Sequence, residues 1–443
     1  MNDFIKFCIV WMLMMIAIEG KTSFIKDLKT DIPFPPVNTE SISGIPDGHL
    51  RPLGWQRKPE GKVREEKEKI GAQTFHLRYA KTIRPVVMRG VLKTEPVLEK
   101  WEQDSYLKDK FGQVNITITV KKEFYNQGPQ HNKRRMLLRK FLLDYKYENW
   151  YLSSTVHDDL MPELPLPEIL SCGSYKQRLT EAEMWMSSGG TASLLHSHGD
   201  HNLHCVIDGR KDFILIDPQY KENFKFQETY ENSGSGHSAM DMDMINMFKF
   251  SKIAQTPWYW STLWQGDCIY VPAGYLHQVR SFGRGISYTV QFAPVKDFDS
   301  TDCKKESKSK RRKKDKKVEE KDEKEKIETE KITLADVDFI WAFSNGERHL
   351  KEKKLVPSTL RRILLILMRD GDQLHKTVFK HFYEDALAGD NQKLSADEVF
   401  NILTPNDARS YLSRDEIKVL NESRLQQVCT IFNKKQETLH DEL

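Results

Sequence analysis

The stretch 194–203 carries three histidines and an aspartate between apolar flanks, and it constrains the chain more than any other. Read as a β-strand, it places four polar side chains on one face: His196, His198, Asp200 and Asn202. A soluble protein rarely gathers so many nitrogen and oxygen ligands on one face unless a metal ion or a polar substrate lies there. A further candidate ligand, His277, ends a Gly-Asp-x4-Pro-x4-His segment that begins at Gly266. These patterns predict a mononuclear metal site inside a small β-barrel.

Short strand patterns surround this stretch and predict that the barrel is built mainly from β-structure. They are Pro85–Leu92, Val114–Val120, Trp150–Ser154, Glu183–Met186, Tyr259–Leu263, Cys268–Val271, Leu276–Phe282 and Ile286–Phe292. The dipeptide Asp208-Gly209 predicts a tight hairpin turn between strands at 201–207 and 211–216. Apolar residues at helical spacing predict helices at 96–111 and 136–145.

The two ends of the chain predict residence in the lumen of the endoplasmic reticulum. Residues 1–20 read as a signal peptide, whose 12-residue apolar run (7–18) is too short for a stable membrane span. Residues 436–443 form a tail that ends in His-Asp-Glu-Leu, the signal read by the retrieval receptor. Outside the signal peptide there are five cysteines, an odd number, so at least one stays free or pairs with another chain. Asn115 and Asn421 lie in N-glycosylation sequons.

The rest of the chain divides by composition. Residues 21–74 predict an extended N-terminal arm, 75–297 the barrel, and 298–331 a charged, solvated linker. The net charge of +4 favours no nucleic-acid partner, because acidic residues nearly cancel the basic run in the linker. Within the barrel, the polar segment 219–256 between two predicted strands is expected to form a mobile lobe. Its alternating Met and Asp residues (240–244) predict a solvated loop.

Residues 332–435 predict an all-α domain with capping boxes at Thr333, Ser395 and Ser413. The segment 379–403 resembles an EF-hand in outline, but counting back from Glu398 as position twelve puts Gln392 where glycine is needed. A calcium-free helix-loop-helix is therefore favoured over a Ca2+ site, although the loop keeps oxygen donors: Asp385, Asp390 and Asn391.

Residues 75–295 resemble the JmjC family of Fe(II)- and 2-oxoglutarate-dependent oxygenases, in its cupin-like branch. The resemblance rests on the 84–92 strand, Trp101, the spacing from His196 to Asn202, the Gly209-Arg210-Lys211 turn and the segment ending in His277. It implies a double-stranded β-helix (jelly-roll, or cupin) barrel with flanking helices. The implied reaction is oxidative decarboxylation of 2-oxoglutarate to succinate, coupled to hydroxylation of a C–H bond in a lumenal protein substrate.

The same resemblance assigns residues to the two cofactors. His196 and His277 would bind the iron, and Lys211 would hold the distal carboxylate of 2-oxoglutarate, helped by hydroxyls of Tyr151 and Ser193. Two amides match positions near the metal and the cosubstrate: Asn202 and Gln291. A lysine in an apolar inward strand suits this role, because a buried ammonium needs an anionic partner.

One position departs from the family pattern, which is His-x-Asp/Glu. This chain has His198 where the carboxylate belongs. Three explanations stay open: His198 ligates as a neutral imidazole, Asp200 reaches the metal instead, or the site binds metal poorly. The first two favour a protein hydroxylase. The third favours a catalytically inactive JmjC-like scaffold or adaptor.

Overall fold

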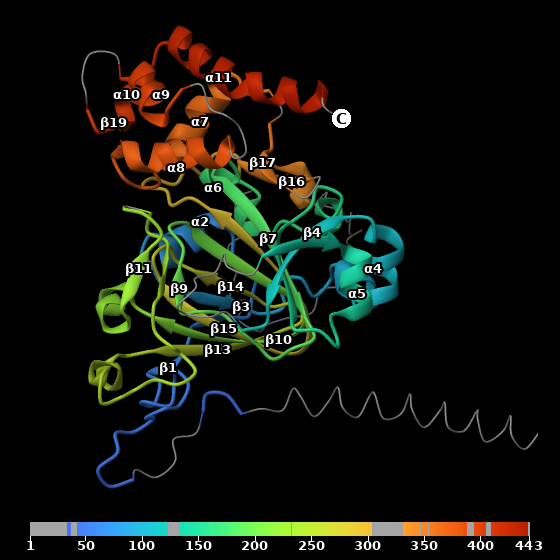
Figure 1. The fold of residues 1–443 in the computed structure, drawn as a ribbon, viewed down its shortest axis with the longest axis vertical. Coiled ribbons are helices and arrows are strands. Elements are labelled where there is room, and N and C mark those ends of the chain that lie inside the picture. The colour runs from blue at the N-terminus through green and yellow to red at the C-terminus, as the bar shows by residue number, and fades with distance from the viewer. Residues whose placement is uncertain are drawn as a thin grey trace, which may run out of the picture.

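The computed structural model describes residues 33–36, 42–122, 133–231, 233–303, 331–344, 347–352, 354–387, 394–404 and 409–441. The predicted signal peptide, most of the predicted charged linker and the last two residues of the predicted retrieval signal lie outside these ranges. The described chain forms a β-barrel with a largely helical region stacked on one end (Figure 1). Among the described residues, none of the helices combines the length and apolar character needed to cross a bilayer.

Fifteen strands of the described chain form one continuous sheet that bends into the predicted jelly-roll barrel. They are β1 (Gly61–Lys62), β2 (Glu65–Glu66), β3 (Val86–Met88), β4 (Asn115–Val120), β5 (Arg134–Leu137), β6 (Trp150–Thr155), β7 (Leu179–Ser187), β8 (Thr191–Ala192), β9 (His196–Ser197), β10 (His201–Ile216), β11 (Phe226–Glu228), β12 (Gly236–Ser238), β13 (Tyr259–Trp264), β14 (Cys268–Val271) and β15 (Leu276–Phe292). The main path runs β2-β3-β14-β10-β15-β7-β6-β4-β5, and β13 pairs with the second half of β10.

The two long strands β10 and β15 hold the barrel together. They pair along almost their whole length, and the register shifts at bulges on either side of Asp208. The prediction of a hairpin at Asp208-Gly209 is therefore wrong, because residues 201–216 form a single strand, β10. Residues 276–292 likewise form a single strand, β15. Gly209 has φ +81°, and a Cβ there would lie 2.2 Å from the Arg284 carbonyl oxygen. The glycine serves a bulge and a close strand approach rather than a turn.

Short helices cover one side of the barrel: α2 (Ala72–Phe75), α3 (Val97–Lys100), α4 (Asp104–Phe111), α5 (Leu138–Asp144) and α6 (Gly173–Lys176). The helix predicted at 96–111 is split, because Trp101 is fully buried and ends α3. The helix predicted from residue 136 begins at Leu138, since 134–137 instead pair with β4. In both cases tertiary pairing and packing override a local helical pattern.

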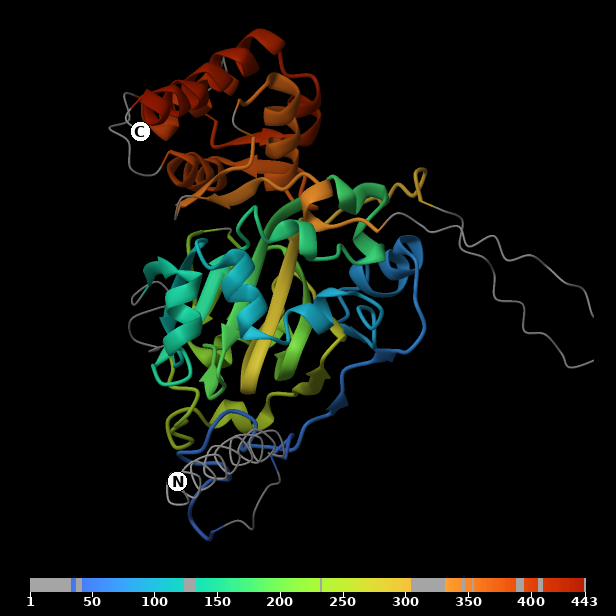
Figure 2. The same ribbon diagram turned by 90° about the vertical axis from the view of Figure 1, so that its right-hand side faces the viewer.

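The N-terminal arm packs against the excursion 219–256. Leu53, Met240, Met242 and Ile245 share one buried cluster with the end of β10. The prediction of a solvated Met–Asp loop is thus wrong for Met240 and Met242, which are buried, whereas Met244 is exposed as predicted. The excursion is packed rather than a loose lobe. Figure 2 shows the described N-terminal segments at the end of the barrel opposite to the C-terminal helices.

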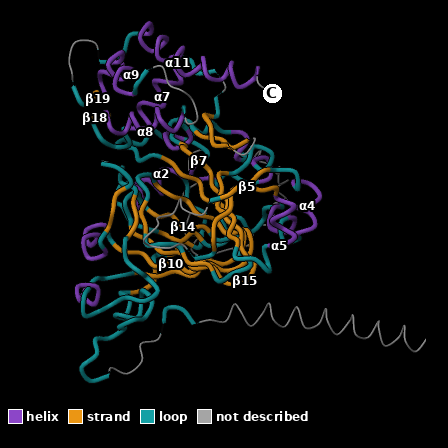
Figure 3. The backbone as a smooth tube through the Cα atoms, viewed as in Figure 1, coloured by secondary structure: helices purple, strands orange, loops and turns teal. Residues whose placement is uncertain are grey.

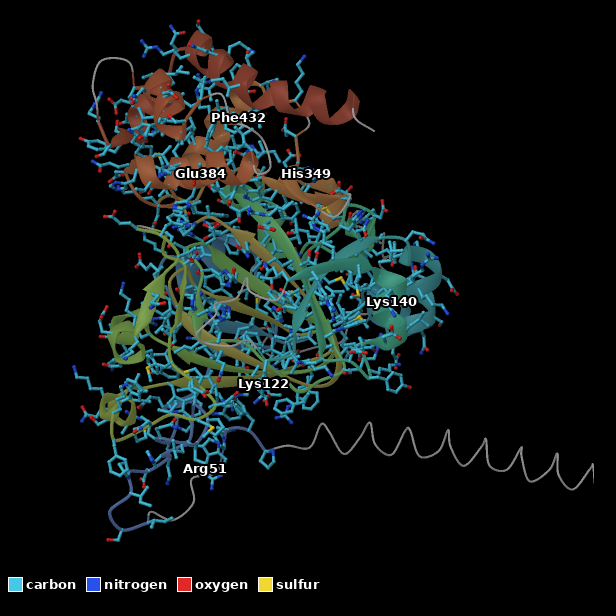
Figure 4. The ribbon with its side chains drawn as sticks, viewed as in Figure 1. Arg51, Lys122, Lys140, His349, Glu384 and Phe432 are labelled. Atoms are coloured by element: carbon cyan, nitrogen blue, oxygen red, sulfur yellow. A yellow bond between two sulfur atoms is a disulfide. The ribbon has the colours of Figure 1, made fainter. Side chains whose placement is uncertain are left out.

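The C-terminal region contains α7 (Pro357–Leu367), α8 (Lys376–Ala386), α9 (Ala396–Leu403), α10 (Arg414–Lys418) and α11 (Glu422–Asp441) (Figure 3). It is not all-α, because two antiparallel ribbons join it: β16 (Trp341–Ser344) with β17 (Glu347–Leu350), and β18 (Gln373–His375) with β19 (Tyr411–Ser413). Strands of three or four residues are too short to show a periodic pattern in the sequence. Phe432 lies among the helices, far from Arg51 of the arm (Figure 4).

The three predicted capping boxes are confirmed at Thr333, Ser395 and Ser413. This result bears on the EF-hand comparison. The Glu398 carboxylate accepts hydrogen bonds from the backbone amide and hydroxyl of Ser395, so it serves the start of α9. Asp385 contacts Arg348, and the loop residues 388–393 lie outside the described chain.

Candidate metal centre

Three histidines come together inside the barrel. His196 on β9 lies directly opposite His277 on β15, and His198 follows β9 by one residue. The ring centroids are 4.1 Å apart for His196 and His277, 5.1 Å for His196 and His198, and 5.6 Å for His198 and His277. Each ring offers one nitrogen, and these three atoms lie within 4.8 Å of one another. A single metal ion can therefore be bound by three imidazoles.

Hydrogen bonds orient two of these rings. The Nδ1 atom of His196 lies 2.8 Å from the Leu194 carbonyl oxygen, and that of His277 lies 3.0 Å from the Tyr275 carbonyl oxygen. A carbonyl only accepts, so Nδ1–H donates in each case and Nε2 keeps its lone pair for a metal. Burial lowers the pKa of all three histidines, and for His198 burial and then the neighbouring His196 lower it to about 3. The rings are neutral at physiological pH, which is the form that binds metal.

Asp200 is directed away from this cluster. The chain bends at Gly199 and Asp200, between β9 and β10, so residues 196–202 do not form the single strand face expected from the sequence. Asp200 accepts a hydrogen bond from Nε of Arg369, at 3.0 Å, which comes from the segment after α7. Asp200 is not among the clustered ligands. The explanation in which Asp200 replaces the missing carboxylate is wrong in this structure, and the three-histidine set remains.

Lys211 lies on the inward face of the barrel without a counter-charge. It is 2% exposed, and its Nζ is 3.5 Å from the Tyr151 hydroxyl. Burial lowers its pKa from 10.5 to about 7. Within the described part of the chain, no carboxylate is recorded in an ion pair with it. An anionic ligand would stabilise a buried ammonium of this kind, because the hydroxyl and ring of Tyr151 carry no negative charge to replace the lost hydration.

Of the remaining predicted residues, Asn202 lies on β10, Gln291 lies on β15, and Ser193 directly follows β8. The Ser193 hydroxyl oxygen accepts from the Val279 amide at 2.9 Å, which leaves its hydrogen free to donate. Asn202 and Gln291 are directly opposite in the β10–β15 register. The Asn202 Oδ1 is buried without a partner among the described residues, whereas Nε2 of Gln291 donates to Glu183 at 2.7 Å. One amide N–H of Gln291 is thus engaged by a protein carboxylate.

Sequence reasoning missed three residues of this region. Glu183 faces Gln291, and burial together with the nearby Glu181 raises its pKa to about 7. His204 continues the alternation of polar residues beyond Asn202 on β10, and that alternation was a usable signal. Arg369 comes from a distant part of the chain, and no local pattern connects it to Asp200.

Fold and site together define a cupin-type barrel with a three-histidine cluster that could hold a metal ion. The barrel also contains a buried lysine, Lys211, without an ion-pair partner in the described part of the chain. The match to known families agrees with this class: residues 72–298, about half of the chain, match the cupin-like domain model. The chain belongs to this family of proteins with a cupin-like domain.

Several characterised proteins are similar to the same region of the chain at low sequence identity. Jumonji C domain-containing protein 5 of Drosophila melanogaster is 24% identical over 219 residues, covering 47% of this chain and 54% of that protein. Lysine-specific demethylase 8 of Xenopus tropicalis is 22% identical over 227 residues, covering 49% of each. The human bifunctional peptidase and (3S)-lysyl hydroxylase JMJD7 is 22% identical over 232 residues, covering 44% of this chain and 73% of that protein. The chain spans about half the length of the first two relatives.

Proposed function

We propose that the protein is an Fe(II)- and 2-oxoglutarate-dependent hydroxylase of protein side chains in the lumen of the endoplasmic reticulum. The observation that carries the proposal is Lys211, a buried amine for which the described residues provide no carboxylate partner, inside the barrel that also holds the three-histidine cluster. A catalytically inactive barrel has no evident need for such a costly buried charge. The residues fit both cofactors, since neutral imidazoles suit iron and a buried cation suits a dicarboxylate.

Each residue has a definite task in this proposal. His196, His198 and His277 would hold Fe(II), and the carbonyls of Leu194 and Tyr275 fix the orientation of two of these rings. Lys211 and Tyr151 would bind the distal carboxylate of 2-oxoglutarate and so set the orientation of its oxo-acid end. When bound, iron and 2-oxoglutarate supply the oxidation: 2-oxoglutarate, O2 and a C–H bond give succinate, CO2 and an alcohol.

The lumenal location is supported by chemistry as well as by the two chain ends. Two disulfides are formed, Cys172–Cys303 and Cys205–Cys268, and the remaining described cysteine, Cys429, is free and buried. Disulfides persist in oxidising compartments and are rare in the cytosol. Asn421 is exposed, so its sequon is accessible to glycosylation.

The experiment uses protein purified without a histidine tag. Calorimetry with Fe(II) under anaerobic conditions, followed by 2-oxoglutarate, is expected to show one site for each. Succinate formation with lumenal protein fractions then tests turnover. Lys211→Met should abolish 2-oxoglutarate binding and leave metal binding unchanged. Absence of either ligand from the wild-type protein refutes the proposal.

A second function is favoured by a specific observation, the histidine at position 198. Replacing a carboxylate ligand by a neutral imidazole makes the site one charge more positive, and this alters oxygen chemistry. In this alternative the barrel and the C-terminal region form a scaffold for lumenal partners. His198→Asp separates the two: turnover that appears only in this variant supports the scaffold. Loss of cellular function in His196→Ala, with partner binding intact, supports the enzyme.

A further inference from the structure

His204 is a buried histidine that the proposed reaction does not yet use. It lies on β10 opposite Thr289 of β15 and is 7% exposed. Its Nδ1 atom is 2.8 Å from the Thr289 hydroxyl oxygen. Its Nε2 atom is buried and has no partner among the described residues. A buried polar atom without a hydrogen-bond partner lowers the stability of the fold, unless a bound ligand supplies that partner.

The neighbours of Thr289 determine which ring nitrogen carries the proton. Nε1 of Trp185 donates to the same hydroxyl oxygen at 3.0 Å, and an indole N–H can only donate. The Thr289 hydroxyl is buried, and within the described chain its only other recorded side-chain partner is Nδ1 of His204. Its hydrogen is therefore donated to Nδ1. A neutral imidazole that accepts at Nδ1 carries its hydrogen on Nε2, so the unpartnered atom is an N–H donor.

The same side chains connect His204 to Lys211. The Trp185 ring stacks on Tyr151 with centroids 5.9 Å apart, and the Tyr151 hydroxyl is the group that Lys211 approaches. Burial and then the charge of Lys211 hold the pKa of His204 well below its usual range, so the ring stays neutral. His204 also contributes to the lowered pKa of His277, although burial is the largest cause there. His204 thus lies in the barrel interior that contains both Lys211 and the metal ligands.

We propose that His204 is a second anchor for the carboxylate bound at Lys211, donating a hydrogen bond from Nε2, with Thr289 and Trp185 setting its tautomer. This inference rests on the proposed function, because the ligand is the cosubstrate, 2-oxoglutarate. It adds a recognition residue beyond the lysine and the hydroxyls expected from the family. Thr289 is a positioning residue, since it acts on the ligand only through the imidazole.

Calorimetric titration with 2-oxoglutarate, in the presence of a redox-inert divalent metal, tests the anchor. His204→Leu should raise the Kd by about tenfold or more, because a hydrogen bond to a charged group is lost. Thr289→Val should raise it several-fold, whereas Ser287→Ala should not change it. Ser287 is the matched control, since its buried hydroxyl lies on the same strand and has no recorded partner in the described chain. Binding of 2-oxobutyrate, which lacks the distal carboxylate, should be equal in all four proteins.

Nitrogen NMR of protein labelled with 15N-histidine reads the tautomer directly, before any ligand is added. The Nε2–H form is expected for His204 in the wild type, and Thr289→Val should shift the two ring nitrogens toward an average of both tautomers. An Nδ1–H form in the wild type would overturn the inference, since a lone pair on Nε2 repels a carboxylate. An unchanged Kd in His204→Leu would overturn it too and leave the proposed function standing. If the wild type binds no 2-oxoglutarate, both fail together.

Discussion

The lowered pKa of Lys211 makes a quantitative prediction about cosubstrate binding. In the ligand-free protein burial holds this pKa near 7, against 10.5 in a solvated lysine. A bound dicarboxylate restores an opposite charge and raises the pKa of the ammonium again. Binding above pH 7 must therefore take up a proton, whereas binding well below pH 7 takes up none. Burial and then the charge of Lys211 hold the pKa of the neighbouring His204 well below its usual range, so this ring stays neutral over the same pH range.

The magnitude follows from the size of this shift. The ligand-competent fraction of Lys211 falls about tenfold for each pH unit above its pKa, which is about 1.4 kcal/mol per unit. The Kd for 2-oxoglutarate should thus be about 30-fold higher at about pH 8.5 than at about pH 6. The ligand-free protein shows the opposite trend: its free energy of unfolding should rise from pH 7 to pH 10.5, because the unfolded chain still holds a proton that the folded chain has lost.

Calorimetry in two buffers with different ionisation enthalpies measures the proton uptake directly. About one proton per ligand is expected at about pH 8.5, and almost none at about pH 6. Lys211→Arg is the matched control, because a guanidinium stays protonated throughout and should remove the pH dependence. A wild-type Kd that is flat over this range, or binding without proton uptake at the higher pH, would refute the reasoning.

Three further outcomes follow from contacts around the site. Gly199→Ala should destabilise the fold by about 2 kcal/mol or more, since a Cβ there would lie 2.1 Å from the Ser233 carbonyl oxygen. Thermal unfolding measures this loss. Gly285→Ala is the control, because a Cβ at Gly285 would meet only an ordinary contact at 3.6 Å. Arg369→Ala should weaken metal binding by about tenfold, because Arg369 holds Asp200 two residues after His198; metal titration followed by absorption of a Co(II) complex tests it against Lys296→Ala, an exposed ion pair to Asp372. Replacing Cys205 and Cys268 by serine should lower the free energy of unfolding, measured with denaturant, by up to about 4 kcal/mol for a loop of this length.

Much of the candidate site could be predicted from short stretches of the sequence. The spacing of His196 and His198 and the segment ending in His277 identified all three clustered ligands, because ligand type and strand periodicity are properties of neighbouring residues. The lysine in an apolar strand was recognisable for the same reason. The capping boxes were also readable, since each is closed within four residues.

Tertiary structure decided what each of these groups faces. The bend at Gly199 is imposed by Ser233 and Arg369, and it turns Asp200 from a candidate ligand into an ion-pair partner. Gly209 reads locally as a hairpin turn, but pairing with β15 makes it a bulge in one continuous strand. Periodicity describes one segment at a time, whereas strand register and long-range contacts depend on segments tens or hundreds of residues apart. The sequence by itself indicated the class of barrel and the candidate metal ligands, with His198 and Asp200 as alternatives for the third position. Only the folded chain decided that His198 joins His196 and His277 while Asp200 pairs with Arg369, and that His204 and Lys211 face the same interior.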